Sequence, residues 1–230
     1  MEGQQIHDWD DRYQHDSPPP WEDLEPHIEF CQFVLRHLDP SLPSLEVGSG
    51  LGHNAVYLAQ QGLSLTASDI APSAVQHIQS LAHDRGLTLP AKVIDVTKAP
   101  HLEHAFAGVV DKGCFHSFFS QQSRTAFVQC IHQLLADGGV WVSSIGSAEH
   151  PDDPNDPWVE TYPRLTLTEI VSLVEPAFEI LEVRTGHYGR TGERQFKTWE
   201  CAFRKRNPLK GNTDDGEKPT DRTGNLTADV

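Results

Sequence analysis

The stretch Leu45-Glu46-Val47-Gly48-Ser49-Gly50-Leu51-Gly52-His53-Asn54 decides the fold of this chain. A short apolar run contains an acidic residue, three glycines follow at alternate positions, and a helix-like segment (55–61) comes next. Glycine has no Cβ and readily adopts positive φ, so such a turn allows close approach of the backbone to a ligand. A dinucleotide site needs the spacing G-x-G-x-x-G. Here the last position of that pattern is His53, and the third glycine, Gly52, comes one residue early.

Strand-like and helix-like segments alternate on both sides of this turn. Strands are expected at 44–48, 63–69, 91–95, 107–111, 139–145, 177–186 and 195–204. Helices are expected at 53–61, 72–85 and 121–136 and after the capping box Thr166–Glu169, with Pro72 in a first turn and Asp137-Gly138-Gly139 as a C-cap. Alternation of this kind is typical of βαβ units, and the short Gly-rich link before the last strand favours an antiparallel pair. We therefore predict a doubly wound α/β fold whose seven-stranded sheet is mostly parallel, with an antiparallel last strand and helices on both faces.

Composition divides the 230 residues into three regions. Residues 1–26 are rich in Asp, Pro and aromatic residues and are predicted to form a lid. Residues 27–206 carry the alternating pattern and suit one domain of ordinary size. Residues 207–230 have almost no large apolar side chains and are predicted to be a disordered polar tail.

The charge balance bounds the possible partners. Lys and Arg number 18 against 33 Asp and Glu, a net charge of −15, so nucleic acid is not expected as a partner. No apolar run reaches the roughly 18 residues of a membrane helix, and the polar N-terminus is not a targeting peptide, so we expect a cytoplasmic protein without membrane contact. The four cysteines form no C-x-x-C pair and the 13 histidines no metal-binding spacing, so we expect neither a metal nor disulfides. Monomer and homodimer both remain open.

Acidic residues occur at the end of each of the first four predicted strands: Glu46, Asp69, Asp95 and Asp111. Ligands of an open α/β sheet bind at the carboxyl ends of the strands. A carboxylate at Asp69 can accept hydrogen bonds from a ribose diol, and one at Asp95 can accept the exocyclic amine of adenine. Any single acid of this set could instead cap a helix or face solvent. Four together favour a nucleoside ligand.

The G-x-G-x-G turn together with these acids resembles the cofactor motifs of class I S-adenosylmethionine (SAM) methyltransferases. The resemblance implies SAM as cofactor and S-adenosylhomocysteine as product. The cofactor contacts that it implies are Trp21, Glu46, Gly48, Ser49, Gly50, Gly52, Asp69, Ile70, Asp95, Val96 and Asp111.

Two flanking segments narrow the resemblance. Trp9-Asp10-Asp11-Arg12-Tyr13 followed by Pro20-Trp21-Glu22, and Asp111-Lys112-Gly113-Cys114-Phe115-His116, are similar to segments of thiopurine and halide/thiol methyltransferases and, more distantly, of tellurite-resistance methyltransferases. With the turn 135–139 the match covers about residues 9–205. The chain departs from those families in two places: it lacks a glycine after Glu22, and it carries Lys112 where they have Arg. The second change replaces a planar guanidinium, which can form two parallel hydrogen bonds, by a compact ammonium group.

The acceptor side is expected to consist of aromatic walls and one histidine. The candidate walls are Trp9, Tyr13, Phe115, Phe119 and Trp158. His116 is the candidate general base, with a purely structural role as the alternative, and the phenylalanines could equally belong to the core. Arg164, in the long polar stretch 147–165, could hold an acidic group of a substrate, although a surface role is favoured for it.

We expect SAM-dependent methyl transfer to a small-molecule nucleophile, with a thiol, sulfide or other chalcogen favoured by the resemblance. A thiol with a pKa near about 8.5 already supplies some thiolate at neutral pH and needs little base catalysis. An O- or N-methyltransferase that uses His116 as base is the alternative. A non-catalytic SAM-binding module and a dinucleotide oxidoreductase are further alternatives, and His53 in the fingerprint disfavours the latter.

Overall fold

The protein is represented by a computed structural model that describes residues 9–14, 24–98, 105–149, 163–188 and 196–207. Two of the expected site residues, Trp21 and Trp158, lie outside these ranges, as does nearly all of the expected tail.

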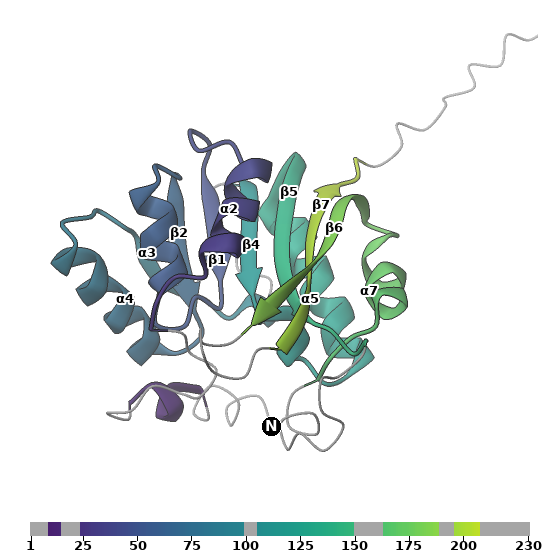
Figure 1. Cartoon of the computed structure of the whole chain (residues 1–230), viewed down its shortest axis with the longest axis horizontal. Helices are drawn as coiled ribbons and strands as arrows, with labels where there is room; N and C mark the ends of the chain where they lie inside the picture. Colours follow the sequence, from purple (N-terminus) through teal and green to yellow (C-terminus); the bar gives the residue numbers. More distant parts are fainter. Residues whose placement is uncertain (1–8, 15–23, 99–104, 150–162, 189–195, 208–230) are drawn as a thin grey trace, which may run out of the picture.

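Within those ranges the strands form one seven-stranded sheet in the order β3-β2-β1-β4-β5-β7-β6 (Figure 1). The strands are β1 (Ser44–Val47), β2 (Leu65–Asp69), β3 (Ala91–Val93), β4 (Phe106–Lys112), β5 (Leu135–Gly146), β6 (Phe178–Tyr188) and β7 (Phe196–Lys205). β1 to β5 are parallel, whereas β7 runs antiparallel to both β5 and β6. The predicted doubly wound sheet with an antiparallel last strand is therefore confirmed.

Helices cover both faces of the sheet. They are α2 (Ile28–His37), α3 (His53–Gln60), α4 (Pro72–Asp84), α5 (Gln121–Leu134) and α7 (Leu167–Val174), with the 3-10 turns η1 (Val96–Lys98) and η2 (Phe115–Ser117). Buried residues of α2, α3 and α4 share one core cluster, and those of α5 and α7 share another. Pro72 occupies the first turn of α4 and Thr166 forms the expected capping box with Glu169. Helix α2 was not anticipated.

One predicted helix end is wrong. α5 ends at Leu134, and β5 begins at Leu135. Gly138, with φ +73°, therefore lies inside the strand rather than at a helix C-cap. The β4–β5 register explains this, because Phe106 pairs with Leu135 whereas Gly108 pairs with Val140. The extra residues of β5 form an irregularity that a glycine with positive φ accommodates.

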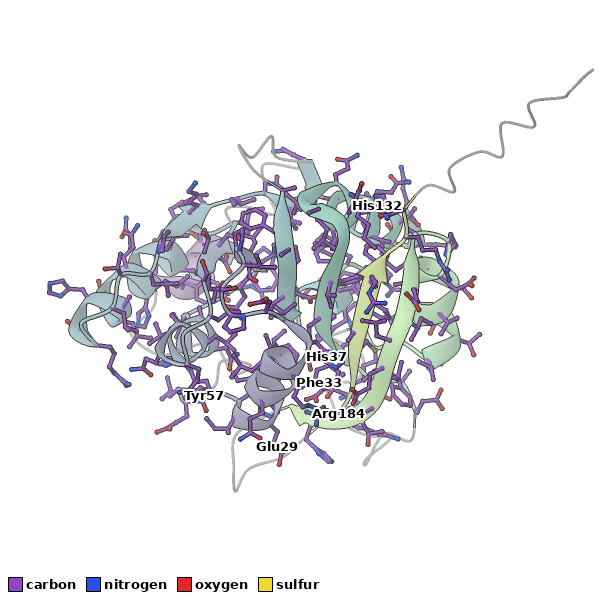
Figure 2. The ribbon with its side chains drawn as sticks, turned by 90° about the horizontal axis from the view of Figure 1, so that it is seen from above. Glu29, Phe33, His37, Tyr57, His132 and Arg184 are labelled. Carbon is purple, nitrogen blue, oxygen red and sulfur yellow. The ribbon has the colours of Figure 1, made fainter. Side chains whose placement is uncertain are left out.

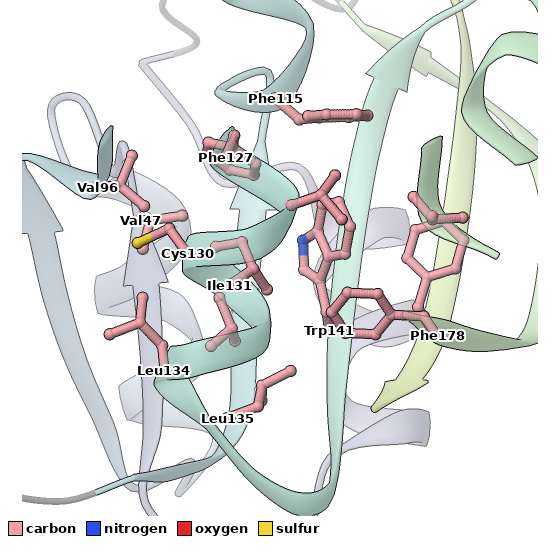
Figure 3. Packing of buried hydrophobic residues seen from close by; sticks show 14 of the residues in the cluster. Val47, Val96, Phe115, Phe127, Cys130, Ile131, Leu134, Leu135, Trp141 and Phe178 are labelled. Carbon is pink, nitrogen blue, oxygen red and sulfur yellow. The ribbon is translucent and has the colours of Figure 1, made fainter. Parts of the chain in front are cut away.

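Large aromatic side chains fill the core on the α5 face (Figure 3). The fully buried Trp141 of β5 has ring centroids of Phe115, Phe178 and Phe203 at 5.4, 5.6 and 4.9 Å. Aromatic contacts of this kind stabilise beyond the area that they bury. They fix the turn after β4 against the centre of the sheet.

Helix α2 is attached to the antiparallel end of the sheet by polar contacts. The Arg184 guanidinium lies 4.5 Å from the Phe33 ring centroid and donates to the Glu29 carbonyl at 2.8 Å. His37 Nε2 lies 2.9 Å from a carboxylate oxygen of Glu182. Figure 2 shows Phe33, His37 and Arg184 together where α2 meets β6. These contacts join α2, which shares a core cluster with α3 and α4, to the last strands of the sheet.

A short helical segment, residues 9–13, lies near the beginning of α4 (Figure 1). Among the described residues, no helix has the length and apolarity needed to cross a membrane.

Candidate functional site

The glycine turn connects β1 to α3 and has the expected backbone. Gly48, Gly50 and Gly52 have φ of 65°, 54° and 83°, and Gly52 caps α3 in the left-handed conformation. A Cβ on Gly48 would lie 2.8 Å from Cβ and Sγ of Cys114, and one on Gly52 would lie 2.6 Å from Cγ1 of Ile78. Neither position has room for a side chain. The turn is thereby held close to the segment after β4 and to α4.

Asp69, at the end of β2, is hydrogen-bonded to this turn. Its Oδ2 accepts from the Gly50 N–H at 2.9 Å, and its Oδ1 accepts from the Ala71 N–H at 2.9 Å. The side chain is nearly fully buried, and burial raises the pKa of Asp69 to about 6 despite these bonds. The Ile70 N–H also bonds to this carboxylate, so three of its four acceptor positions are used within the protein and one is left for a ligand donor. The acid is therefore placed against the turn, as a ribose ligand requires.

Ser49 joins the turn to the same strand. Its N–H donates to the Ser68 carbonyl at 2.9 Å, and its hydroxyl accepts from the Ser68 N–H at 3.2 Å. Glu46 is buried in β1 opposite Ala67 and Val110, and Ile70 directly follows Asp69. The expected first two cofactor motifs thus form one connected structure.

Asp95 lies at the end of the next strand, β3. Its Oδ1 accepts from the N–H and hydroxyl of Thr97 at 3.0 and 2.5 Å, and Lys98 Nζ lies 3.1 Å from Oδ2. Burial acts to raise the pKa of this carboxyl, but the bonds from Thr97 and Lys98 outweigh it and lower the pKa. The carboxylate thus stays charged and orders η1, which begins with the buried Val96.

Asp111 does not have the position of a cofactor ligand. Its side chain is fully buried, Oδ1 accepts from the Phe115 N–H at 3.0 Å, and Oδ2 accepts from Trp141 Nε1–H at 2.8 Å. Burial raises its pKa to about 6. The predicted direct contact is corrected accordingly: the carboxylate anchors the turn after β4 from inside the core.

Phe115 is a second correction. Its ring is fully buried between Phe127 and Trp141, with centroids 5.4 Å away in each case, so it belongs to the core and forms no substrate wall. The 3-10 turn points it inward. Phe119, by contrast, is 71% exposed and is accessible to a ligand.

The helical segment 9–13 is hydrogen-bonded to the first turn of α4. Asp10 Oδ1 accepts from the Ser73 N–H, in the first turn of α4, at 2.8 Å. The charge of Asp10 also acts to raise the pKa of Asp69, after the dominant effect of burial. Trp9 and Tyr13 in this segment are partly buried, and the Arg12 guanidinium lies 5.0 Å from the Trp9 ring centroid. Sequence reasoning missed Asp10, although a helix N-terminus with no capping side chain of its own is a signal for such a partner.

His116 lies in η2, beyond the end of β4, and is joined to the end of β5. Its Nδ1 accepts from the Gly146 N–H at 2.8 Å. Burial, followed by the charges of Lys112, Arg164 and Arg124, lowers the pKa of His116 to about 4. The structure thus gathers cationic side chains from β4, α5 and the segment before α7 around one neutral imidazole. Sequence reasoning missed Arg124 and Gly146, which have no motif.

The environment of the Cys114 thiol is not that of a nucleophile. Burial, with the charges of Asp111 and Asp69, raises its thiol pKa well above the ordinary value. Its role is to pack against Gly48. No group of three metal-ligating side chains occurs among the described residues.

The arrangement suits a nucleoside-containing cofactor without a pyrophosphate. A positive-φ turn, a buried carboxylate bonded to it and a second carboxylate on the next strand occupy one edge, while the His116 turn lies across β1 on the β4–β5 side. The sheet order and this edge define a class I SAM-dependent methyltransferase fold.

The comparisons with known proteins agree. Residues 45–139 match a family described as a methyltransferase domain. The chain is 30% identical over 159 residues, 67% of each protein, to a 2-heptyl-1-hydroxyquinolin-4(1H)-one methyltransferase of Mycobacteroides abscessus.

Two solved structures share the fold. A protein studied for the conversion of a disulfide bond into a thioacetal group during echinomycin biosynthesis superposes with a TM-score of 0.74 at 21% identity, covering 87% of this chain and 93% of that one. The N-methyltransferase NodS of Bradyrhizobium japonicum, bound to S-adenosylhomocysteine, has a TM-score of 0.67 at 18% identity, with 88% and 98% covered. The chain belongs to the class I SAM-dependent methyltransferases. It is an enzyme that uses SAM to methylate a small molecule.

Proposed function

We propose that the methyl acceptor is a small molecule whose hydroxyl or thiol is acidic enough to be ionised near neutral pH. The observation that carries this proposal is the set of cationic side chains around His116, contributed by Lys112, Arg124 and Arg164. Their combined field favours an anion at the acceptor end of the site, within a chain whose net charge is −15.

The leading acceptor class is an acidic hydroxyl on a small heteroaromatic ring. The M. abscessus relative is named for a substrate with a hydroxyl on a ring nitrogen, and such a hydroxyl is more acidic than an alcohol. A thiol is the second class. The flanking segments around Trp9 and Asp111 resemble those of thiol-directed methyltransferases, and a thiol shares the property of ready ionisation.

The cofactor side of the proposal uses the residues that meet at the edge of the sheet. The turn Gly48–Gly52 approaches the cofactor with its backbone, Asp69 accepts from the ribose, and Asp95 with Val96 binds the adenine. SAM supplies a methyl group made electrophilic by its sulfonium. The lid formed by residues 1–26, including Trp9 and Tyr13, excludes water and aligns the acceptor.

Arg164 provides the test, because its side chain lies beside both Gly146 and His116. Arg164→Gln removes the charge, and Arg164→Lys keeps it. Steady-state kinetics would compare an N-hydroxyquinolinone, an aromatic thiol and a neutral alcohol of similar size. We expect turnover of the two acidic acceptors, a rise in their KM of about tenfold in Arg164→Gln (about 1.4 kcal/mol), and a smaller change in Arg164→Lys. Preferred turnover of the neutral alcohol, with equal KM in both variants, would refute the proposal.

A further inference from the structure

The protonation site of His116 is determined by its hydrogen bond to the backbone. The Gly146 N–H donates to Nδ1 at 2.8 Å. A peptide N–H can only donate, so Nδ1 must be the unprotonated nitrogen. A neutral imidazole carries one proton, which is therefore on Nε2. His116 as a residue is half-buried, and within the described part of the chain Nε2 has no hydrogen-bond partner.

This tautomer is locked from several sides. A second proton could only be added at Nδ1, where it would face the Gly146 N–H and break that bond. It would also place a positive charge near Lys112 of β4, Arg124 of α5 and Arg164. Gly113 N–H donates to the Ser144 carbonyl at 3.0 Å, so the turn that carries His116 is joined to β5 at a second point. The imidazole cannot easily turn over to present a basic nitrogen.

A general base needs an unprotonated nitrogen directed at the proton that it removes. In His116 the nitrogen that is not bonded to the backbone already carries a proton. The histidine therefore offers a donor, in a fixed direction, at the edge where the cofactor and acceptor meet. This argues against the role of His116 as a base in the sequence-based hypothesis.

We propose that His116 is a fixed hydrogen-bond donor whose Nε2–H binds the ionised nucleophile of the methyl acceptor, or a carbonyl oxygen beside it, and so selects acceptors that carry such an atom. The inference rests on the proposed function, since it requires an acceptor that arrives ionised. A lone pair of the ionised oxygen or sulfur forms the new bond to the methyl carbon. The carbon–sulfur bond of the sulfonium breaks with its electron pair remaining on sulfur, and no proton passes to the protein.

The decisive pair of variants is His116→Gln and His116→Ala. A glutamine amide can accept from the Gly146 N–H with its oxygen and donate with its nitrogen, but it is not a base. We expect His116→Gln to keep kcat/KM within about threefold and His116→Ala to lose about 10- to 100-fold, the range for a hydrogen bond to a charged group. The pH profile of kcat/KM should follow the ionisation of the acceptor in wild type and in His116→Gln, and should move when an acceptor of different pKa is used.

A base would give another pattern. Both variants would then lose activity to the same extent, both would be rescued at high pH, and the profile would not move with the acceptor; these results would overturn the inference. SAM affinity, measured calorimetrically, reports that each variant retains the cofactor site. If wild type prefers neutral acceptors, the proposed function fails, whereas the tautomer of His116 is tested separately by a measurement that involves no acceptor.

Nitrogen-15 NMR of the histidine rings of the wild-type protein tests the tautomer without any measurement of activity. The His116 signals, assigned by their loss in His116→Gln, should report protonation at Nε2 between pH 6 and 8, because the pKa lies at about 4. Protonation at Nδ1 would overturn the inference.

Discussion

Gly52→Ala tests why the third glycine of the turn is a glycine. Gly52 has φ +83°, a conformation that costs an L-residue with a side chain about 1–2 kcal/mol. The new Cβ would also lie 2.6 Å from Cγ1 and 3.2 Å from Cβ of Ile78. Ile78 is fully buried in α4, so it cannot move aside freely, and overpacking of this kind costs about 1–3 kcal/mol. After the gain of about 0.4–1 kcal/mol from a stiffer unfolded chain, the net loss of stability is about 1–4.6 kcal/mol, with a midpoint of about 3 kcal/mol.

Gly62→Ala is the matched control. Gly62 follows α3 with φ +90°, and a Cβ there would meet nothing within 4 Å. It should therefore lose only the conformational part, about 1 kcal/mol after the same compensation. Urea unfolding followed by circular dichroism would measure both free energies of unfolding, with unchanged m-values as the check on two-state behaviour.

A double-mutant cycle separates the clash from the backbone strain. Ile78→Ala alone should cost about 2–5 kcal/mol as a buried truncation, but it removes the atom nearest to the new Cβ. Gly52→Ala should then cost about 1–2 kcal/mol less in the Ile78→Ala background than in wild type. If the two changes add within about 0.5 kcal/mol and Gly52→Ala costs no more than Gly62→Ala, the packing argument is wrong.

Two further predictions concern buried and bridging carboxylates. The pKa of Asp111 is about 6 in the fold against an ordinary value of 3.8, so its contribution to stability is complete below pH 3.8 and is lost as pH rises through 6. The wild-type protein should gain about 1.4 kcal/mol of stability from this group when the pH is lowered from 7.5 to 5, and Asp111→Asn should lack this gain. Urea unfolding midpoints of both proteins at the two pH values would measure the difference. Equal changes in the two proteins would contradict the prediction. Asp10→Ala removes the acceptor of the Ser73 N–H and should weaken SAM binding about fivefold, from about 1 kcal/mol of lost capping. The exposed Asp11→Ala should leave calorimetric affinity unchanged, and equal weakening in both variants would show that this bond does not support the site.

The sheet was predictable because its signals are local. The alternation of strand-like and helix-like segments predicted the parallel sheet, and the rule that ligands bind at strand carboxyl ends placed Asp69 and Asp95 on one edge. The helix end near Gly138 was wrong because β5 pairs with β4 through an irregularity that only the register reveals. Local turn chemistry favoured a C-cap there, and tertiary pairing overrode it.

The two corrected site residues were wrong for a common reason. Asp111 and Phe115 belong to a motif at a strand end, where an acid and an aromatic ring suggest a ligand. The structure turns both toward Trp141, which lies 30 residues further along the chain than Asp111. Sequence spacing predicts which edge a residue occupies, but the direction of its side chain depends on partners that spacing does not show.

The acceptor side is harder to predict than the cofactor side because its parts are distant in sequence. Gly146 becomes a hydrogen-bond partner of His116 only because the fold brings the two together, and Arg164 reaches the same place from a different segment. None of the three lies in a motif with the others.

The glycine turn joins these two sides. Gly48 is in close contact with Cys114, whose turn carries His116, and Gly52 is in close contact with Ile78 of α4, whose first turn receives Asp10. A side chain at either glycine would displace an element that carries a site residue. The alternate glycines therefore hold the turn between β1 and α3 in close contact with the turn after β4 on one side and with α4 on the other. A G-x-G-x-G turn in this fold is thus evidence about packing as much as about the ligand.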